Sequence, residues 1–138
     1  MNHYTMADMH PGLAAQFTVT VTAEKMQLFY QLSGDDSPIH MDDAYAGQRG
    51  YPGRVCYGML QASFFSTLAG VYLPGEHCLL HSVEAKFTKP VFIGDTLTVS
   101  GTVAEADETF RVVTIKAQII NQHGQKVCRG LIRAGLAK

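Results

Sequence analysis

The segment Gly58–Leu73 constrains the fold more than any other part of this sequence. It runs for sixteen residues without a charged side chain, and its apolar residues are spread around the whole circumference of a helix. A helix that is apolar on every side has to be covered on nearly all of them. The remainder of the chain must therefore supply a surface long enough to wrap around it.

Alternating apolar and polar residues in the C-terminal half predict that surface. This period-2 pattern is typical of strands with one buried face, and it covers residues 82–88, 96–103, 112–119 and 128–136. Turn residues such as Gly94-Asp95 separate these strands, so we interpret them as an antiparallel meander. A long, strongly twisted antiparallel sheet around one central hydrophobic helix is an α+β fold of the hot-dog type, which is the predicted fold.

The N-terminal part of the chain predicts one short strand and one helix. Residues 1–16 show no sustained periodicity, and we expect them to form a loose arm. Residues 17–21 alternate between apolar side chains and threonines, as in a half-buried strand. Thr22 is a suitable N-cap for a helix over residues 23–33, which is expected to end at Gly34.

Composition excludes several classes of function. The chain has 138 residues and a net charge of −1 at pH 7, so it has no basic field for nucleic acid or for an anionic membrane surface. No stretch has the pattern of a signal peptide or of a membrane span. Cys56, Cys78 and Cys128 form no C-x-x-C motif, which fits reduced thiols and a cytoplasmic location. Without repeats or linkers, residues 1–138 are expected to form a single domain.

The segment before Gly58 carries the candidate chemistry. More than twenty residues separate the predicted helix from Gly58, with only one helical turn expected, around residues 41–46. Loops of this length in a compact domain are usually functional or disordered, and the aromatic and aliphatic residues here argue against disorder. Asp35 and His40 flank Pro38, whose ring stiffens the backbone between them. A carboxylate and an imidazole so placed can hold one water and exchange protons with a substrate.

The start of the apolar helix adds a third chemical element. N–H groups in a first helical turn lack intrahelical partners, and the helix dipole favours negative charge there. Gly58 has no Cβ, so a carbonyl oxygen can approach its N–H closely. Ser63, further along the helix, either contacts a thioester or bonds a backbone carbonyl. These parts permit the addition of water to, or its removal from, a double bond conjugated with a thioester. In the alternative interpretation, Asp35 is a solvated carboxylate and His40 a structural histidine.

Three motifs stand in an order that resembles one family. They are S-G-D-x-x-P-I-H-x-D from Ser33, G-M-L from Gly58 and K-P-V-x-x-G-D from Lys89. Together they resemble the MaoC-like hydratases, in particular the short (R)-specific enoyl-CoA hydratases. The resemblance covers nearly the whole chain from Phe17 onward.

That resemblance implies a reaction and a set of roles. Asp35 would be the general base that activates water, and His40 would orient the water and supply the proton at Cα. Gly58 would be the oxyanion donor. The implied reaction is the reversible syn hydration of a trans-2-enoyl thioester to the (3R)-hydroxyacyl form, without a metal or redox cofactor. The family also implies a hot-dog homodimer with each site at the subunit interface.

Two positions depart from the family pattern, which usually has Asn in place of Ser37 and His in place of Tyr57. Both departures affect substrate choice more than reaction type, and we treat Ser37, Tyr57 and Ser63 as candidate substrate-binding residues. The substrate's carrier, coenzyme A or an acyl carrier protein, stays open. Its pantetheine phosphate could contact four cations, namely Arg49, Arg54, Lys86 and Lys89.

Other functions stay open on the sequence alone. A (3R)-hydroxyacyl-acyl-carrier-protein dehydratase of a fatty-acid or polyketide pathway is the nearest alternative. Two further alternatives are an acyl-thioester hydrolase and an inactive subunit that binds acyl chains. A hydrolase of this fold normally has a carboxylate on or near the central helix, and residues 58–73 contain none. The acidic and histidine residues lack a convincing set of metal-ligand spacings, so no metal site is expected.

Overall fold

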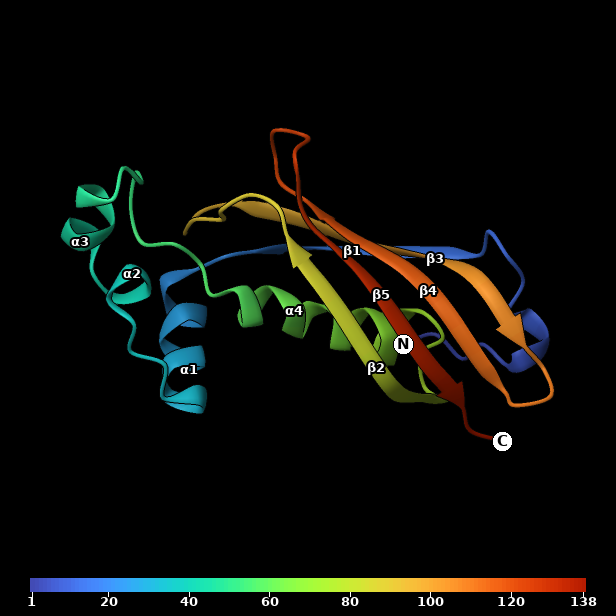
Figure 1. The fold of residues 1–138 in the computed structure, drawn as a ribbon. Helices are drawn as coiled ribbons and strands as arrows, with labels where there is room; N and C mark the ends of the chain where they lie inside the picture. Colours follow the sequence, from blue (N-terminus) through green and yellow to red (C-terminus); the bar gives the residue numbers. More distant parts are fainter.

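The computed structural model describes residues 1–138 and contains one five-stranded antiparallel sheet, in the order β1-β3-β4-β5-β2. Its strands are β1 (Ala14–Thr20), β2 (Cys78–Phe87), β3 (Thr96–Asp107), β4 (Val112–Ile120) and β5 (Lys126–Leu136). The sheet is curved, and helix α4 lies along one of its faces (Figure 1). The predicted hot-dog arrangement is confirmed.

The central helix α4 (Gly58–Thr67) continues as a π-helix over Leu68–Tyr72. Three further helices, α1 (Ala23–Ser33), α2 (Pro38–Met41) and α3 (Asp43–Gln48), lie together beyond one end of the sheet (Figure 1). A single 3-10 turn spans Met6–Asp8. None of the helices combines the length and the apolar character needed to cross a membrane.

The ends of α1 follow the prediction. The Thr22 side chain accepts a hydrogen bond from the N–H of Lys25, and Gly34 ends the helix in the left-handed region at φ 74°. The segment after Gly34 differs, because it forms two short helices where one turn was expected. Asp42 starts the second of them by accepting hydrogen bonds from the N–H groups of Ala44 and Tyr45.

The strand order corrects the predicted meander. β2 pairs with β5, whereas β3 pairs with β1 and β4. The chain therefore passes from the edge strand β2 through the Gly94 turn to β3, on the far side of β4 and β5, and only β3-β4-β5 is a meander. The period-2 pattern specifies which side chains face the core, but it carries no information on which strand is the neighbour.

Two glycines of the sheet let α4 and its π-helical continuation approach closely. A Cβ on Gly130 would lie 2.6 Å from a ring carbon of Phe65, and a Cβ on Gly101 would lie 2.9 Å from Cδ2 of Leu68. Both helix side chains are fully buried. One polar side chain of α4 is also buried: Gln61, whose Oε1 has no hydrogen-bond partner.

This chain alone does not cover α4 on every side, contrary to the prediction. Met59 is 67% exposed. The edge strand β2 also leaves apolar side chains open, because Leu80, Val83 and Phe87 are all exposed although their partners on β5 are buried. An uncovered apolar flank therefore runs along β2 and the start of α4.

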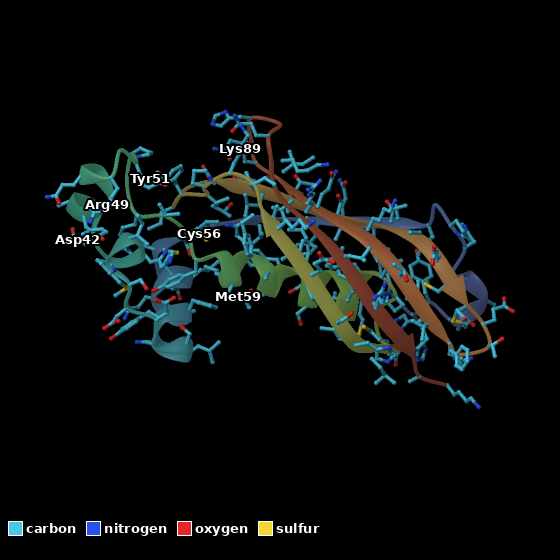
Figure 2. The ribbon with its side chains drawn as sticks, in the orientation of Figure 1. Asp42, Arg49, Tyr51, Cys56, Met59 and Lys89 are labelled. Atoms are coloured by element: carbon cyan, nitrogen blue, oxygen red, sulfur yellow. The ribbon has the colours of Figure 1, made fainter.

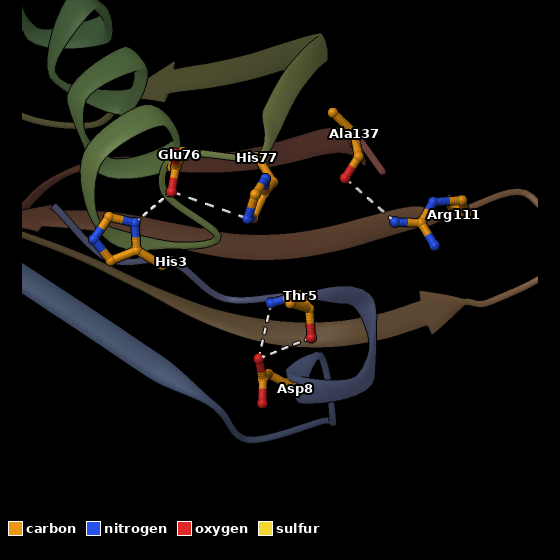
Figure 3. Close-up of polar contacts among 7 residues, drawn as sticks. All are labelled: His3, Thr5, Asp8, Glu76, His77, Arg111 and Ala137. Atoms are coloured by element: carbon orange, nitrogen blue, oxygen red, sulfur yellow. Dashed lines mark hydrogen bonds and ion pairs between the residues drawn. The ribbon is translucent and has the colours of Figure 1, made fainter.

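Residues 1–16 are not a loose arm. Met6 and Met9 are buried in the core, and β1 already begins at Ala14. The N–H of Asn2 donates to the carbonyl of Val71 at 2.8 Å. Figure 3 shows further polar contacts at this end of the molecule, including those between the His3 and Glu76 side chains and between Thr5 and Asp8. The prediction failed because isolated methionines fill the end of the core without any periodic pattern.

Candidate active site

Asp35 lies in the connection between α1 and α2, where Ser37 holds its carboxylate. Oδ1 of Asp35 accepts hydrogen bonds from the Ser37 hydroxyl at 2.6 Å and from the Ser37 N–H at 3.0 Å. These two bonds, the hydroxyl's first, and the nearby His40 lower the pKa of the Asp35 carboxyl. The carboxylate therefore stays ionised to lower pH than a free aspartate does.

His40 lies on α2, half-buried, and its ring is fixed by a main-chain carbonyl. Nδ1 lies 2.7 Å from the carbonyl oxygen of Val55. A carbonyl oxygen only accepts hydrogen bonds, so Nδ1 carries the hydrogen and Nε2 is left to exchange a proton. Arg54 supports the same residue from the other side, because its Nε donates to the His40 carbonyl at 2.8 Å.

Tyr57 joins these two groups. Its side chain is buried, and its ring stacks on the His40 imidazole with centroids 4.2 Å apart. Its hydroxyl donates to the main-chain carbonyl of Asp35 at 2.7 Å and lies 3.3 Å from Sδ of Met41. The ring also packs on Phe29 of α1 at 4.7 Å. In this structure Tyr57 offers no open surface to a ligand, so it contacts the candidate catalytic segment where we had expected it to contact substrate.

Gly58 follows Tyr57 directly and begins α4. That end of α4 is directed toward α1, α2 and α3 (Figure 1). A Cβ on Gly58 would lie 3.2 to 3.4 Å from three ring carbons of Phe87 on β2. Its N–H is one of the first-turn donors that have no partner within the helix. The main chain of Asp35, the imidazole of His40 and the N–H of Gly58 are thus all next to Tyr57.

The remaining predicted site residues have local partners. The Ser37 hydroxyl is engaged with Asp35, as described above. The Ser63 hydroxyl donates to the carbonyl of Leu60 at 2.6 Å, which is the second of the two alternatives predicted for it. Ser63 lies further along α4 on the exposed flank of the helix.

Sequence reasoning missed the groups that orient the site. Val55 acts through its main-chain carbonyl, which no side-chain motif can reveal. Arg54 was considered only as a phosphate ligand, yet its Nε is turned to the His40 carbonyl. Phe87 was included only in the predicted strand over residues 82–88. Its contact distance to Gly58 depends on how β2 packs against α4.

The four candidate phosphate ligands do not form one cluster. Arg49 lies over the Tyr45 ring at 4.1 Å and donates to its hydroxyl at 2.8 Å. Figure 2 shows Arg49 beside α3 and Lys89 near the turn between β4 and β5, well apart. Lys86 lines a hollow on the outer face of the sheet. No three His, Cys, Asp or Glu side chains are placed to share a metal ion.

Comparisons with known proteins identify the family of this chain. Residues 7–124 match the family model described as MaoC like domain. The chain is 34% identical over 114 residues to the (R)-specific enoyl-CoA hydratase of Rhodospirillum rubrum, which covers 83% of this chain and 78% of that protein. It is 32% identical over 119 residues to the (R)-specific enoyl-CoA hydratase of Aeromonas caviae, with 86% and 89% covered.

Solved structures of (R)-hydratases share the fold of this chain. R-hydratase PhaJ1 from Pseudomonas aeruginosa, in its unliganded form, superposes with a TM-score of 0.90 at 30% identity, covering 96% of this chain and 85% of that chain. The (R)-hydratase from A. caviae involved in PHA biosynthesis gives a TM-score of 0.89 at 30% identity, covering 93% and 97%. With the family model matching most of its length and its fold shared with these hydratases, the chain belongs to the MaoC-like family.

Proposed function

We propose that the protein catalyses the reversible (R)-specific hydration of trans-2-enoyl thioesters to (3R)-hydroxyacyl thioesters, a hydro-lyase reaction. One observation carries the proposal. Tyr57 contacts the main-chain carbonyl of Asp35 and the ring of His40, and it immediately precedes the free N–H of Gly58. Base, acid and oxyanion donor are therefore neighbours, as this reaction requires. The names of the two hydratase relatives support the same substrate class.

The Asp35 carboxylate activates the water. Its Oδ1 already accepts two hydrogen bonds from Ser37, and its second oxygen is available to accept a proton from water. As that proton leaves, the water oxygen bonds to Cβ of the enoyl group. The hydrogen bonds to Asp35 lower its pKa, so the base is present in its ionised form at neutral pH.

The electrons displaced from the double bond move onto the thioester oxygen, where the Gly58 N–H stabilises the negative charge. The imidazolium form of His40 then donates the proton on Nε2 to Cα, while Nδ1–H stays bonded to the carbonyl of Val55. Transfer of the proton from Asp35 back to Nε2 restores the site. In the proposed geometry both groups face the same side of the substrate, so hydroxyl and hydrogen are added syn.

Coenzyme A is the carrier that we propose, because both curated relatives described above are named for enoyl-CoA. Dehydration of a (3R)-hydroxyacyl thioester on an acyl carrier protein is the second candidate, since it uses the same groups in reverse. No metal or redox cofactor takes part in either reaction. The three free thiols fit a reducing compartment, and we place the enzyme in the cytoplasm.

A homodimer completes the proposal. β2 is an edge strand with unpaired N–H and C=O groups on one side, and exposed edges are sites for pairing with another chain. Beside it lies the uncovered flank formed by Leu80, Val83, Phe87 and Met59. A second copy on this flank would cover α4 and close the edge. Sedimentation velocity should then give the mass of two 15.1-kDa chains. A mass of one chain at micromolar concentration would contradict the dimer.

The test of the reaction is hydration of crotonyl-CoA, followed as loss of the absorbance of the conjugated thioester. We expect Asp35→Asn and His40→Ala each to lower kcat by about two to four decades. Asp36→Asn is the matched control, because Asp36 is an exposed neighbouring carboxylate with no hydrogen bond, and it should leave kcat unchanged.

The same assay separates the alternatives. A (3R)-specific hydroxyacyl-CoA dehydrogenase should oxidise the product. Oxidation by a (3S)-specific enzyme instead would contradict the proposed stereochemistry. Release of free thiol without loss of the double bond would identify a thioester hydrolase. Equal activities of wild type, Asp35→Asn and His40→Ala would remove both residues from the mechanism.

A further inference from the structure

We propose that Tyr57 is a positioning residue, which holds the Asp35 backbone and the His40 ring in the geometry that catalysis requires. The inference rests on the proposed function for its kinetic part. It assigns a role to the residue that stands where the family pattern usually has histidine. That role is different from the contact with substrate expected from the sequence.

The hydroxyl and the ring of Tyr57 make different contacts. Its hydroxyl is directed only to the catalytic segment, with the Asp35 carbonyl at 2.7 Å and Sδ of Met41 at 3.3 Å. One face of its ring stacks on His40 at an interplanar angle of 28°. Phe29 packs on the ring from α1 at a tilt of 46°. The side chain is therefore enclosed between α1 and α2.

Filling the core does not explain the hydroxyl. A phenylalanine would occupy nearly the same volume, and burying a hydroxyl is unfavourable unless it is hydrogen-bonded. Here the bond goes to the main chain of the proposed base, 22 residues earlier in the sequence. It fixes the peptide plane after Asp35, and with it the main chain from which the Asp35 side chain extends, while Ser37 holds the carboxylate itself.

The ring of Tyr57 restricts the imidazole of His40, the second proposed catalytic group. The bond from Nδ1 to Val55 leaves the imidazole of His40 one axis about which it can tilt. Stacking on Tyr57 blocks that tilt from one side and so fixes the direction of Nε2. One buried side chain therefore restrains both the main chain that carries the proposed base and the ring of the proposed acid.

The state of the phenol is compatible with this role. Burial, together with the negative charge of Asp35, raises the pKa of the Tyr57 hydroxyl. Arg54 acts in the opposite direction with a smaller effect, and Asp36 and Tyr30 add to the increase. The hydroxyl thus stays protonated and keeps donating over the range in which the enzyme would work.

The kinetic test uses Tyr57→Phe, which removes only the hydroxyl. We expect kcat to fall about 10- to 100-fold, because small misplacements of catalytic groups have effects of this size, with KM within about twofold of wild type. Tyr72→Phe is the matched control. Tyr72 stacks on Phe17 and its hydroxyl has no hydrogen-bond partner, so its kcat should not change. A wild-type kcat in Tyr57→Phe would overturn the inference.

A second measurement does not need activity. Hydrogen exchange followed by mass spectrometry should show faster exchange across residues 35–42 in Tyr57→Phe than in wild type, with exchange over residues 64–72 unchanged. Unchanged exchange over 35–42, or equally faster exchange throughout the chain, would overturn the positioning role.

The two measurements distinguish failure of this inference from failure of the proposed function. Wild-type protein that hydrates no enoyl thioester, together with the local change in exchange, would reject the proposed reaction and retain the role of Tyr57 in holding the segment. Active wild-type protein, with Asp35→Asn inactive and Tyr57→Phe fully active, would retain the proposed reaction and reject the role of Tyr57.

Discussion

Replacement of Gly58 by alanine tests the start of α4 most directly. The added methyl carbon would lie 3.2, 3.3 and 3.4 Å from three carbons of the Phe87 ring. These contacts are short by a few tenths of an ångström, and all three are to carbons of one side-chain ring, which can shift by that amount without moving the main chain. The shift costs about 1 kcal/mol or less of folding free energy, as for a modest departure from a rotamer. The variant should therefore fold.

The effect on catalysis should be much larger. The methyl would stand beside the N–H that the thioester oxygen has to approach, and removing one oxyanion donor costs about 100- to 1,000-fold in kcat, or about 2.7 to 4 kcal/mol. We expect kcat of Gly58→Ala on crotonyl-CoA to fall about 100-fold. The loss in transition-state stabilisation would thus exceed the loss in folding stability.

A double variant separates the two causes. If crowding of Phe87 causes the loss, then Gly58→Ala combined with Phe87→Ala should recover the kcat of Phe87→Ala alone, since the clashing ring is gone. If the methyl blocks the carbonyl, as we expect, the double variant should stay about 100-fold below Phe87→Ala. Recovery in the double variant, or near-normal turnover of Gly58→Ala, would refute the assignment of the oxyanion donor.

Three further predictions follow from individual contacts. Ser37→Ala removes the hydroxyl that contributes most to lowering the pKa of Asp35. The pKa of Asp35 should therefore rise, and the acid limb of the pH profile of kcat/KM should move to higher pH. An unmoved limb would show that Asp35 is not the base. Gln61→Leu removes a buried acceptor without a partner and should raise the free energy of unfolding by about 1 to 3 kcal/mol, measured in urea; a less stable variant would mean that the amide has a partner. Gly130→Ala would place a Cβ 2.9 Å from the carbonyl oxygen of Glu84 and 2.6 Å from the Phe65 ring. It should lower the free energy of unfolding in urea by about 1 to 3 kcal/mol. The control is Gly47→Ala on α3, where a Cβ would meet nothing within 4 Å, and this variant should be as stable as wild type.

Local features were the most predictable part of the fold. Thr22 and Gly34 bound α1 as expected, because capping depends on side-chain chemistry within a few residues. Alternation likewise located β3, β4 and β5 and their buried faces, whereas the large apolar side chains that it assigned to a buried face of β2 are exposed in the single chain. The partner of β2 was wrong, because any strand with the same alternating pattern presents an equivalent edge. The buried Met6 and Met9 were missed, since single apolar residues in an irregular segment have no pattern.

The candidate site was also only partly predictable from the sequence. The motif around Asp35 and His40 identified the chemical groups, and their family resemblance suggested the roles. It did not reveal that Ser37 bonds the Asp35 carboxylate or that Arg54 bonds the His40 carbonyl. The expectation for Tyr57 failed because only packing shows whether a side chain beside a site faces the ligand or the protein.

The sequence by itself determined the secondary structure of the long elements, the need for a sheet around an apolar helix, and which residues are the candidate acid, base and oxyanion glycine. These properties depend on interactions between near neighbours in the chain and on the apolar or polar nature of each residue. Tertiary structure alone decided the strand order, the packing of the N-terminal segment against the core and the enclosure of Tyr57 between α1 and α2. Each of these brings together residues far apart in sequence, and their contacts exist only once the layers of the fold have packed.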